Sequence, residues 1–328
     1  VVSANKDLVA LYGPDIIHKA IENHVNFSCE ASVGGGIPIL MPLHQSLAAN
    51  QIESIVGILN GTTNYILSQM TETGVNYANA LADAQKQGFA EADPTNDVCG
   101  FDAARKLAIL SSIGFRANVT FDDVLVEGIE KIDKSDIQYA KDMGYTIKLL
   151  TVALRQENGI ALNVYPAFLP DNHPLSSVKG AYNAIYVTGN IVDDVMFYGR
   201  GAGALPTASA VMGDVISTAQ HILNGSTGTG MIMTDTKRIP FYSSLKLQNS
   251  YYFRLDVDDV TGVLSQIAAA FAENDISICE VVQKRKTKGL AELVLITELA
   301  SRESILQVEK ALQVLPCMRK VANVIRVM

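Results

Sequence analysis

The spacing of apolar residues predicts helices and strands in alternation over the first part of the chain. Apolar positions at helical spacing predict a helix that Gly13 closes, and Pro14 opens a second, amphipathic helix. The apolar run VNFSCEASV at 25–33 reads as a strand. Strands that alternate with helices are typical of an α/β architecture.

Another strand and helix are predicted within QIESIVGILNGTTNYILSQM at 51–70. The pattern indicates a strand, then a tight turn at Asn60 and Gly61, then a helix with Thr62 or Thr63 as its N-cap. A hydroxyl at the N-cap accepts a hydrogen bond from one of the first backbone N–H groups of a helix. We therefore place the start of this helix after the turn.

The middle of the chain changes from helical to strand-like periodicity. FDAARKLAILSSIGF at 101–115 predicts a strongly apolar helix, and the region from about 125 to 205 is rich in strand patterns. A long helix follows at 206–223, with Pro206 in its first turn, where a missing N–H group is tolerated. Residues 225–247, rich in Gly, Ser and Thr, read as a linker.

Beyond the linker, residues 248–328 predict a separate domain. The strand and helix patterns follow the order βαββαβ, which is the arrangement of a ferredoxin-like unit. The predicted fold class is therefore α/β with a C-terminal ferredoxin-like βαββαβ domain.

Composition narrows the classes of function. A chain of 328 residues, 48% of them apolar, can bury more than one domain core. The net charge of −8 and the pI near 5.2 leave no basic surface for nucleic acid. Apolar runs such as 37–43 are far shorter than the ~20 residues of a membrane span. Four cysteines without CxxC spacing suggest neither a zinc site nor disulfides, which favours a cytoplasmic protein.

Two glycine-rich segments are candidates for ligand binding. GRGAGA at 199–204 formally satisfies G-x-G-x-x-A, but Gln220 and His221 stand where a dinucleotide fingerprint has an acidic residue. The segment is either a tightly packed strand-to-helix turn or the edge of a cofactor site. CEASVGGGIPIL at 29–40 combines the Glu30 carboxylate with three glycines. This segment is either a tight connection between domains or a set of oxygen ligands for a hard cation.

The charged residues around the strongly apolar helix are the candidates for catalysis. Asp102 and Lys106 are four residues apart and share one helix face. If the helix is buried, the lysine must reach a polar cleft, because an unpaired buried charge is very unfavourable. Glu91, Asp93 and Asp97 lie just upstream. This set either holds a zwitterionic amino acid and protonates an oxygen on it, or is an ordinary loop followed by a helical ion pair.

Five segments together resemble, in order and spacing, the motifs of homoserine dehydrogenases. They are ANK at 4–6, EASVGGGIPI at 30–39, NGTTNYIL at 60–67, GFAEADPTNDVCGFDAARKLAIL at 88–110 and GRGAGALPTASAV at 199–211. The resemblance implies an NAD(P)-dependent oxidoreductase that reversibly reduces L-aspartate 4-semialdehyde to L-homoserine in threonine and methionine biosynthesis. It also implies a remnant of a Rossmann domain at 1–28, with the helix at 206–223 packed on it, and an α+β catalytic and dimerisation domain at 29–205.

Roles for individual residues follow from the same resemblance. Lys106 matches the proton donor to the carbonyl oxygen. Asp97 and Asp102 match residues that order the substrate amino group and the lysine. Gly88 and Glu91 match part of the homoserine site.

Further matched positions concern the cofactor and a cation. Lys6 resembles a lysine near the nicotinamide and the substrate, and Gly203 resembles a cofactor contact. A monovalent cation site, usually for sodium, is implied at Glu30 and at the backbone carbonyls of Val33, Gly35 and Ile37.

Residues 248–328 separately resemble an ACT domain, with DVTGVLSQIAAAF at 259–271 as its strand-to-helix ligand loop. Asp259, Gly262 and Val263 lie near the effector position that this resemblance implies. The implied effector is an amino acid, with threonine as a feedback inhibitor. The alternative is a domain that only assembles a homo-oligomer, either a dimer or a tetramer.

Two other functions stay open at this point. One is a non-catalytic amino-acid-binding regulator that uses residues 248–328 alone, and the other is a dehydrogenase for a related carbonyl substrate. No GxGxxG loop precedes Val1 in the sequence, although the resembled family begins with one. We therefore expect a truncated N-terminus, an exposed helix at 206–223, and no homoserine oxidation by this chain alone. The choice between NAD and NADP is expected to lie outside the chain.

Overall fold

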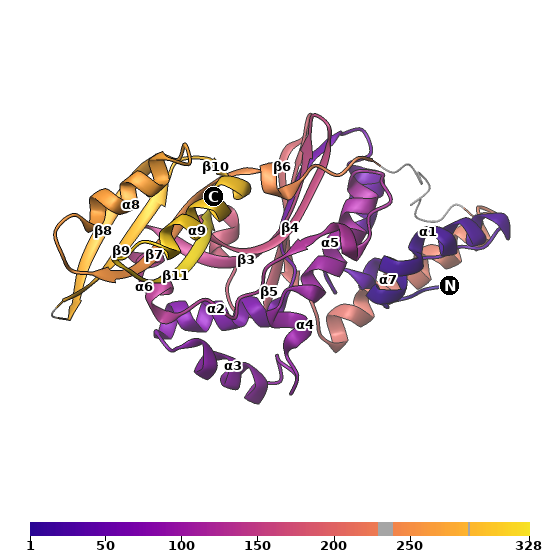
Figure 1. Cartoon of the computed structure of the whole chain (residues 1–328). Coiled ribbons are helices and arrows are strands. Elements are labelled where there is room, and N and C mark those ends of the chain that lie inside the picture. Colours follow the sequence, from indigo (N-terminus) through magenta and orange to yellow (C-terminus); the bar gives the residue numbers. More distant parts are fainter. Residues whose placement is uncertain (229–238, 288) are drawn as a thin grey trace. The chain divides into compact units, whose positions relative to one another are not determined.

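The computed structural model describes residues 1–228, 239–287 and 289–328 and divides into two compact units (Figure 1). Unit 1 comprises residues 1–130, 149–165 and 177–242. Unit 2 comprises residues 131–148, 166–176 and 243–328. Strands β3 (Tyr145–Gln156) and β4 (Gly159–Pro170) contribute residues to both units. The sequence-based domain boundaries stay a prediction, and part of the predicted linker lies outside the described residues.

Unit 1 begins with a single helix, α1 (Lys6–Glu22). The Asn5 side chain caps it by accepting hydrogen bonds from the backbone N–H groups of Asp7 and Leu8. The prediction of two helices divided at Gly13 was wrong, because Pro14 lies inside α1. A proline removes one backbone hydrogen bond, and the helix continues on both sides of it.

The predicted strand over 25–33 was also wrong. Only an isolated bridge between Val2 and Ser28 and a short 3-10 helix at Glu30–Ser32 occur there. Gly34 and Gly35 follow with positive φ angles of 75° and 55°, which turn the backbone away from an extended path.

The central sheet of unit 1 confirms the strand-rich prediction. Its order is β6-β5-β1-β3-β4, and β2 pairs in parallel with β4. Strand β1 pairs antiparallel with β3 and β5, and β5 pairs antiparallel with β6. The remaining strands span β1 (Ile52–Ile58), β2 (Leu125–Val126), β5 (Tyr182–Gly189) and β6 (Asp193–Arg200).

Helices α2 to α5 lie between β1 and β2 in the sequence. They span α2 (Gly61–Thr73), α3 (Tyr77–Lys86), α4 (Thr95–Val98) and α5 (Phe101–Gly114). Most residues of α5 are buried, as its apolar sequence predicts. The N-cap of α2 is Asn60, so the prediction of Thr62 or Thr63 was wrong. Both threonines lie inside the helix and are buried.

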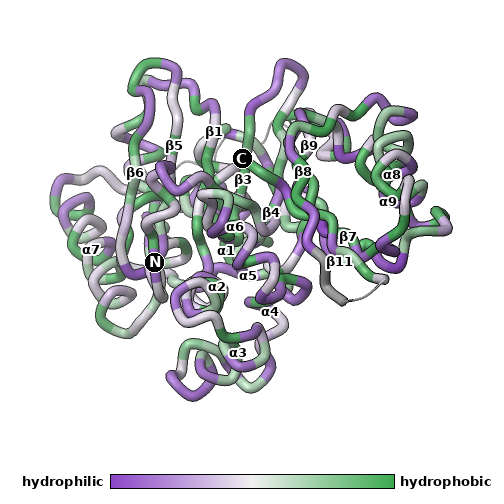
Figure 2. Tube along the Cα trace, turned by 90° about the vertical axis from the view of Figure 1, so that its left-hand side faces the viewer, coloured by the Kyte–Doolittle hydropathy of each residue, from purple (hydrophilic) through white to green (hydrophobic). Residues whose placement is uncertain are grey.

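The last helix of unit 1, α7 (Ala204–Leu223), is largely exposed, as expected for the helix at 206–223. Asp214 is its one buried residue. Several apolar side chains face solvent, and Leu205 and Leu223 are 83% and 85% exposed. Figure 2 shows hydrophobic turns along this helix. No described helix is long and apolar enough to span a membrane.

Unit 2 has the predicted βαββαβ order in residues 248–328. Its sheet order is β11-β7-β9-β8, and residues 167–168 of β4 pair in parallel with β11. Helix α6 (Lys134–Asp142) also belongs to this unit. The other elements span β7 (Gln248–Asp258), α8 (Val263–Ala272), β8 (Ile278–Thr287), β9 (Leu290–Thr297), β10 (Ala300–Ser301), α9 (Arg302–Gln313) and β11 (Met318–Val327).

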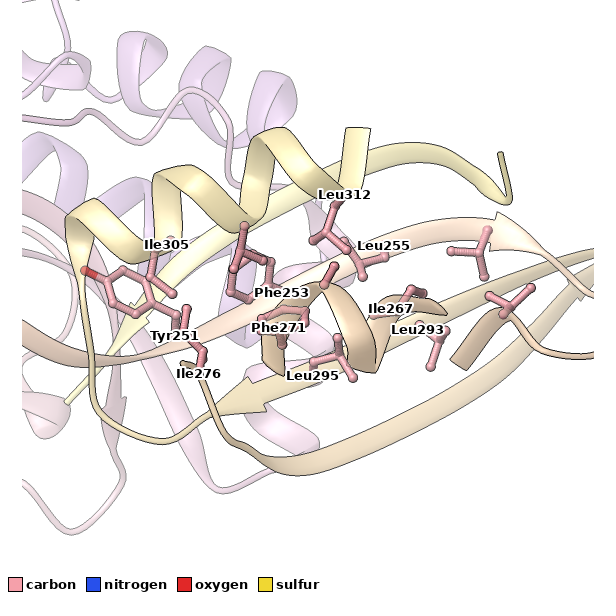
Figure 3. Packing of buried hydrophobic residues seen from close by; sticks show 14 of the residues in the cluster. Tyr251, Phe253, Leu255, Ile267, Phe271, Ile276, Leu293, Leu295, Ile305 and Leu312 are labelled. Atoms are coloured by element: carbon pink, nitrogen blue, oxygen red, sulfur yellow. The ribbon is translucent and has the colours of Figure 1, made fainter. Parts of the chain in front are cut away.

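The core of unit 2 follows from the alternation of residues along β7. Tyr251, Phe253 and Leu255 belong to one apolar cluster with residues of α8 and α9, such as Phe271 and Leu312 (Figure 3). Successive side chains of a strand point to opposite faces of the sheet. Residues 252 and 254 therefore point away from this cluster.

Candidate active site

The candidate site lies where strand β1 ends and helix α5 begins. Leu59 and Asn60 directly follow β1, and α5 starts after Gly100, whose φ of 83° is readily adopted only by glycine. Asp102 lies in the first turn of α5, where the helix dipole favours a negative charge. Lys106 lies one turn later on the same face.

Lys106 is held by two oxygen acceptors. Its Nζ donates to Asp102 Oδ2 at 2.7 Å and to the Leu59 carbonyl at 2.9 Å. The Lys106 side chain is only 13% exposed. Lys6 adds a second cation, with its Nζ 3.5 Å from Asp102 Oδ1. The structure therefore brings together three of the predicted site residues.

Asp102 is ionised despite its burial. Burial alone raises the pKa of its carboxyl group, but the neighbouring Lys106, together with Asn60 and Lys6, more than offsets that effect. The net result is a pKa below the ordinary value of 3.8. Asp102 is therefore a carboxylate at neutral pH, in hydrogen-bond contact with Lys106.

Asn60 connects Asp102 to Asp97. Its Nδ2 donates to Asp97 Oδ1 at 2.7 Å and to Asp102 Oδ2 at 2.9 Å. Burial raises the pKa of Asp97, and the charge of Asp102 adds to this increase. A role for Asn60 in this site was not predicted from the sequence, although an asparagine before a helix pattern is a recognised N-cap signal.

These residues border a cleft of about 600 Å³. Lys6, Asp102 and Lys106 line it, and Gly88 is also part of its lining. The lining also contains small uncharged residues, which include Gly35, Gly201, Ala202 and Gly203. Because they carry little or no side chain, they form a wall that a planar group can approach closely.

Glycine is required on this wall by packing and by backbone conformation. A Cβ atom at Gly35 would lie 2.5 Å from the Gly201 carbonyl oxygen. Gly203 has a φ of 118° and is the N-cap of α7. The segment at 199–204 is thus a tightly packed strand-to-helix turn that also lines the cleft.

Glu91 borders a second, smaller pocket of about 250 Å³. Lys6, Asp97 and Asp102 line both pockets. Arg105 also lines the smaller one, and its Nε lies 3.3 Å from Asp7 Oδ1. Glu91 and Gly88 therefore line two different pockets that share Asp97 and Asp102.

The cation site predicted at Glu30 stays a prediction, and the structure shows what holds the Glu30 carboxylate. It accepts hydrogen bonds from the backbone N–H groups of Ile39, Leu40 and Met41, at 2.6, 2.8 and 2.9 Å. It thus satisfies the first free N–H groups of the helical segment that starts at Leu40. The described residues contain no cluster of three or more His, Cys, Asp or Glu side chains that could hold a metal.

The predicted effector residues lie in unit 2, at the junction of β7 and α8. Gly262 is the N-cap of α8, with a φ of 89°. Val263 is buried, and the Asp259 N–H group donates to the Gly289 carbonyl at 3.0 Å.

Comparison with known proteins gives consistent matches. A homoserine dehydrogenase family model matches residues 38–216, and an ACT domain model matches residues 251–317. The homoserine dehydrogenase of Bacillus subtilis is 41% identical over 330 residues, covering 100% of this chain and 76% of that protein. The homoserine dehydrogenase of Corynebacterium glutamicum is also 41% identical, covering 99% of this chain and 74% of that protein.

Solved structures agree with these sequence matches. A homoserine dehydrogenase from Thiobacillus denitrificans is similar with a TM-score of 0.94 and 37% identity, covering 100% of this chain and 76% of that one. A hyperthermophilic archaeal homoserine dehydrogenase mutant, solved in complex with NADPH, has a TM-score of 0.58 and 28% identity. That match covers 67% of this chain and 64% of the archaeal one.

Proposed function

The chain belongs to the homoserine dehydrogenase family of NAD(P)-dependent oxidoreductases, and we propose that the 600 Å³ cleft is where L-aspartate 4-semialdehyde and L-homoserine are interconverted. One observation carries this proposal. Lys106 is held by Asp102 and the Leu59 carbonyl at the edge of a cleft whose lining includes a glycine- and alanine-rich segment at 201–203. A cation in this position suits a reaction that develops negative charge on an oxygen.

Lys106 would act as the general acid in the direction of reduction. The bound nicotinamide would supply the hydride. As the aldehyde oxygen gains negative charge, Lys106 gives it a proton, and the Asp102 carboxylate keeps the ammonium oriented towards the cleft. In homoserine oxidation the same amine accepts the hydroxyl proton.

The substrate amino group would be held by the acidic residues. Asp97 forms no ion pair with a lysine or arginine among the described residues, so its carboxylate is available to a ligand ammonium. Glu91 lies on the adjacent pocket and would add a second carboxylate. The backbone of Gly88, which has a φ of 77°, would line the homoserine site from the larger cleft.

The cofactor would approach from the glycine-rich wall. Gly203 would contact the dinucleotide, and Lys6 would lie between the nicotinamide and the substrate. Residues 1–28 and α7 would form part of the NAD(P)-binding domain. The exposed apolar side chains of α7 support this assignment, because an apolar helix surface is normally covered.

A sodium ion would be held by Glu30 together with the backbone carbonyls of Val33, Gly35 and Ile37. Carboxylate and carbonyl oxygens are hard ligands of the kind such a cation prefers. The left-handed turn at Gly34 and Gly35 supports this proposal, because it redirects the backbone carbonyls of the loop.

The ACT domain would bind an amino-acid effector, with threonine as the proposed inhibitor at Asp259, Gly262 and Val263. Assembly into a homo-oligomer is proposed from strand β6, at the end of the unit 1 sheet. Met196 and Tyr198 are exposed on this edge strand, and an exposed edge is a natural site for association.

One assay tests these proposals together. The longest form of the protein that the gene encodes is supplied with L-homoserine and either NAD+ or NADP+, and reduction of the cofactor is followed. We expect turnover with L-homoserine well above that with serine, 4-hydroxybutyrate or other hydroxy compounds. Added threonine should lower the rate, and exchange of sodium for a large organic cation should lower it as well.

The outcomes separate the individual proposals. Equal turnover of 4-hydroxybutyrate and homoserine would argue against ammonium recognition by Asp97 and Glu91. A rate unaffected by threonine would refute threonine as the effector of the ACT domain. Loss of homoserine turnover under every condition would refute the assignment of the cleft.

A further inference from the structure

We propose that Asn60 is a positioning residue for the reaction, because its single amide group holds the carboxylates of Asp97 and Asp102 in fixed places beside Lys106. This inference rests on the proposed function of the cleft. Asn60 is 4% exposed and lies between the end of β1 and the start of α2. It is therefore buried at the junction between a strand and a helix.

The orientation of the Asn60 amide is determined by its neighbours. Its Oδ1 accepts hydrogen bonds from the backbone N–H group of Thr63 at 2.8 Å and from Thr63 Oγ1 at 3.0 Å. A flipped amide would place its NH₂ group against the Thr63 N–H donor and its oxygen against two carboxylates. The NH₂ group must therefore face Asp97 and Asp102.

Both hydrogens of that NH₂ group are used. One bond goes to Asp97 Oδ1 at 2.7 Å and the other to Asp102 Oδ2 at 2.9 Å. The two acids belong to different helices, α4 and α5. One neutral side chain thus fixes the spacing between a carboxylate that holds Lys106 and one that is available to the substrate.

The two carboxylates depend on Asn60 to different extents. Asp102 also has Lys106 and Lys6 as partners. Asp97 pairs with no lysine or arginine among the described residues, and it is held by the Asn60 amide at 2.7 Å and by the Thr62 side chain. Loss of the Asn60 donor would release Asp97 first, and repulsion from Asp102 would favour its movement away.

Asn60→Asp is the sharpest variant because it is nearly isosteric. It keeps an oxygen that can cap α2 but replaces two donors with a third carboxylate. Asn60→Ser keeps a capping oxygen and adds no charge, so it separates the loss of the donor from repulsion. Asn76→Asp is the matched control, because Asn76 caps α3 in the same way, accepting from Asn79 N at 2.9 Å, and the bond is exposed.

The first measurement is a carbon-13 NMR titration of aspartate carboxyl groups in the 328-residue chain. In Asn60→Asp, the pKa values of Asp97 and Asp102 should both rise, with Asp97 the more affected. In Asn76→Asp they should stay as in the wild type. Thermal unfolding of each variant checks that the fold is retained.

The second measurement is the steady-state rate of homoserine oxidation by the longest form of the protein that the gene encodes. Asn60→Asp should lower kcat about 100-fold, the size of effect expected from a misplacement of about 1 Å, and should move the acid limb of the pH profile to higher pH. Asn60→Ser should lower kcat without moving that limb as far. A purely structural cap would give unchanged kcat in folded variants.

The results distinguish this inference from the proposed function. Folded Asn60→Asp and Asn60→Ser proteins with wild-type carboxyl titrations would overturn the positioning role, even if homoserine is turned over. Shifted carboxyl titrations with unchanged kcat would also overturn it. A wild-type enzyme that fails to oxidise homoserine would refute the proposed function, while the titration alone would still decide whether Asn60 holds the two acids.

Discussion

Two groups of charges in this protein are buried in different ways. The cleft cluster consists of Lys6, Asn60, Asp97, Asp102 and Lys106, and it borders an open volume in unit 1. The Arg254 cluster lies within unit 2, where Arg254 is 5% exposed and Asp136 is 0% exposed. Its further members are Asp133, Tyr139, Tyr252, Glu292 and Asn323.

The charged groups of the Arg254 cluster pair with one another. The Arg254 guanidinium donates to Asp136 Oδ1 at 2.7 Å and to Glu292 Oε2 at 3.4 Å, and it also pairs with Asp133. Asn323 Nδ2 donates to Asp136 Oδ2 at 2.7 Å. Burial alone would lower the pKa of Arg254, but Asp136 and the other acids raise it above its ordinary value.

The two clusters differ in whether their charged groups can still reach a ligand. In the Arg254 cluster, acids of α6 and its N-cap meet a cation of β7, so the charges hold a helix against a sheet. In the cleft cluster, Asp97 and Lys106 face space that a ligand can enter. A buried charge network thus indicates chemistry only where it is left open.

The largest effect that would sharpen this comparison is expected at Lys106. Lys106→Ala should lower kcat by about 10² to 10⁴, the range for a lost general acid, with a smaller effect on the KM of the cofactor. Lys106→Arg keeps the charge, but the guanidinium hardly releases its proton, so the rate should stay low. Steady-state kinetics with homoserine measures both variants.

Lys179 offers a control, because it lines neither pocket and pairs with Glu72 at 3.2 Å on the surface. Lys179→Ala should retain most of the rate. If the Lys106→Ala enzyme has wild-type kcat, Lys106 takes no part in the chemistry and its pair with Asp102 is only structural. If the Lys106→Arg enzyme is fully active, the role of Lys106 is purely electrostatic.

The next effect concerns stability rather than catalysis. Arg254→Ala should destabilise unit 2 by about 3–5 kcal/mol, because it leaves Asp136 buried without its cation. Lys284→Ala is the matched control, since Lys284 pairs with Asp142 at 3.6 Å on the surface and should contribute at most about 1 kcal/mol. Denaturant unfolding measures both variants, and equal destabilisation by the two would contradict the contrast drawn here.

The smallest effects are opposite pH responses at Asp97 and Asp102. The pKa of Asp102 is lowered on folding, so its contribution to stability is present above pH 3.8 and is lost as the pH falls through the folded value. The pKa of Asp97 is raised, so its ionisation reduces stability as the pH rises above 3.8. At pH 7, Asp102→Asn should therefore destabilise the protein and Asp97→Asn should stabilise it.

Urea unfolding at pH 7 and at about pH 3 measures this pair. The difference between the two variants should shrink at the lower pH, where protonation of the carboxyl groups removes its cause. The same sign for both variants at pH 7 would mean that the two carboxylates do not have the distinct environments described.

Sequence patterns predicted those features that are carried by contiguous residues. The apolar helix with Asp102 and Lys106 and the βαββαβ order of residues 248–328 were confirmed. Asn60 was assigned to a turn, because Asn-Gly is also a turn signal and its contacts with Asp97 and Asp102 involve residues 37 and 42 positions away.

Other features could not be read from local patterns, because their partners are distant or are backbone groups. Arg254 and Asp136 are 118 positions apart. The three N–H groups that occupy the Glu30 carboxylate have no signature in side-chain sequence. The unbroken helix across Pro14 depends on packing that overrides local preference.

The makeup of unit 2 has a consequence for protein engineering. A transplant of residues 248–328 alone would leave behind α6 together with Asp133 and Asp136, and Arg254 would arrive in its new host with Glu292 as its remaining acidic partner from this cluster. A chimaera that keeps unit 2 intact must receive three segments rather than one, because residues 131–148 and 166–176 belong to the same unit as residues 243–328. Recombination at a single linker would therefore transfer the residues that match the ACT domain but not the whole compact unit.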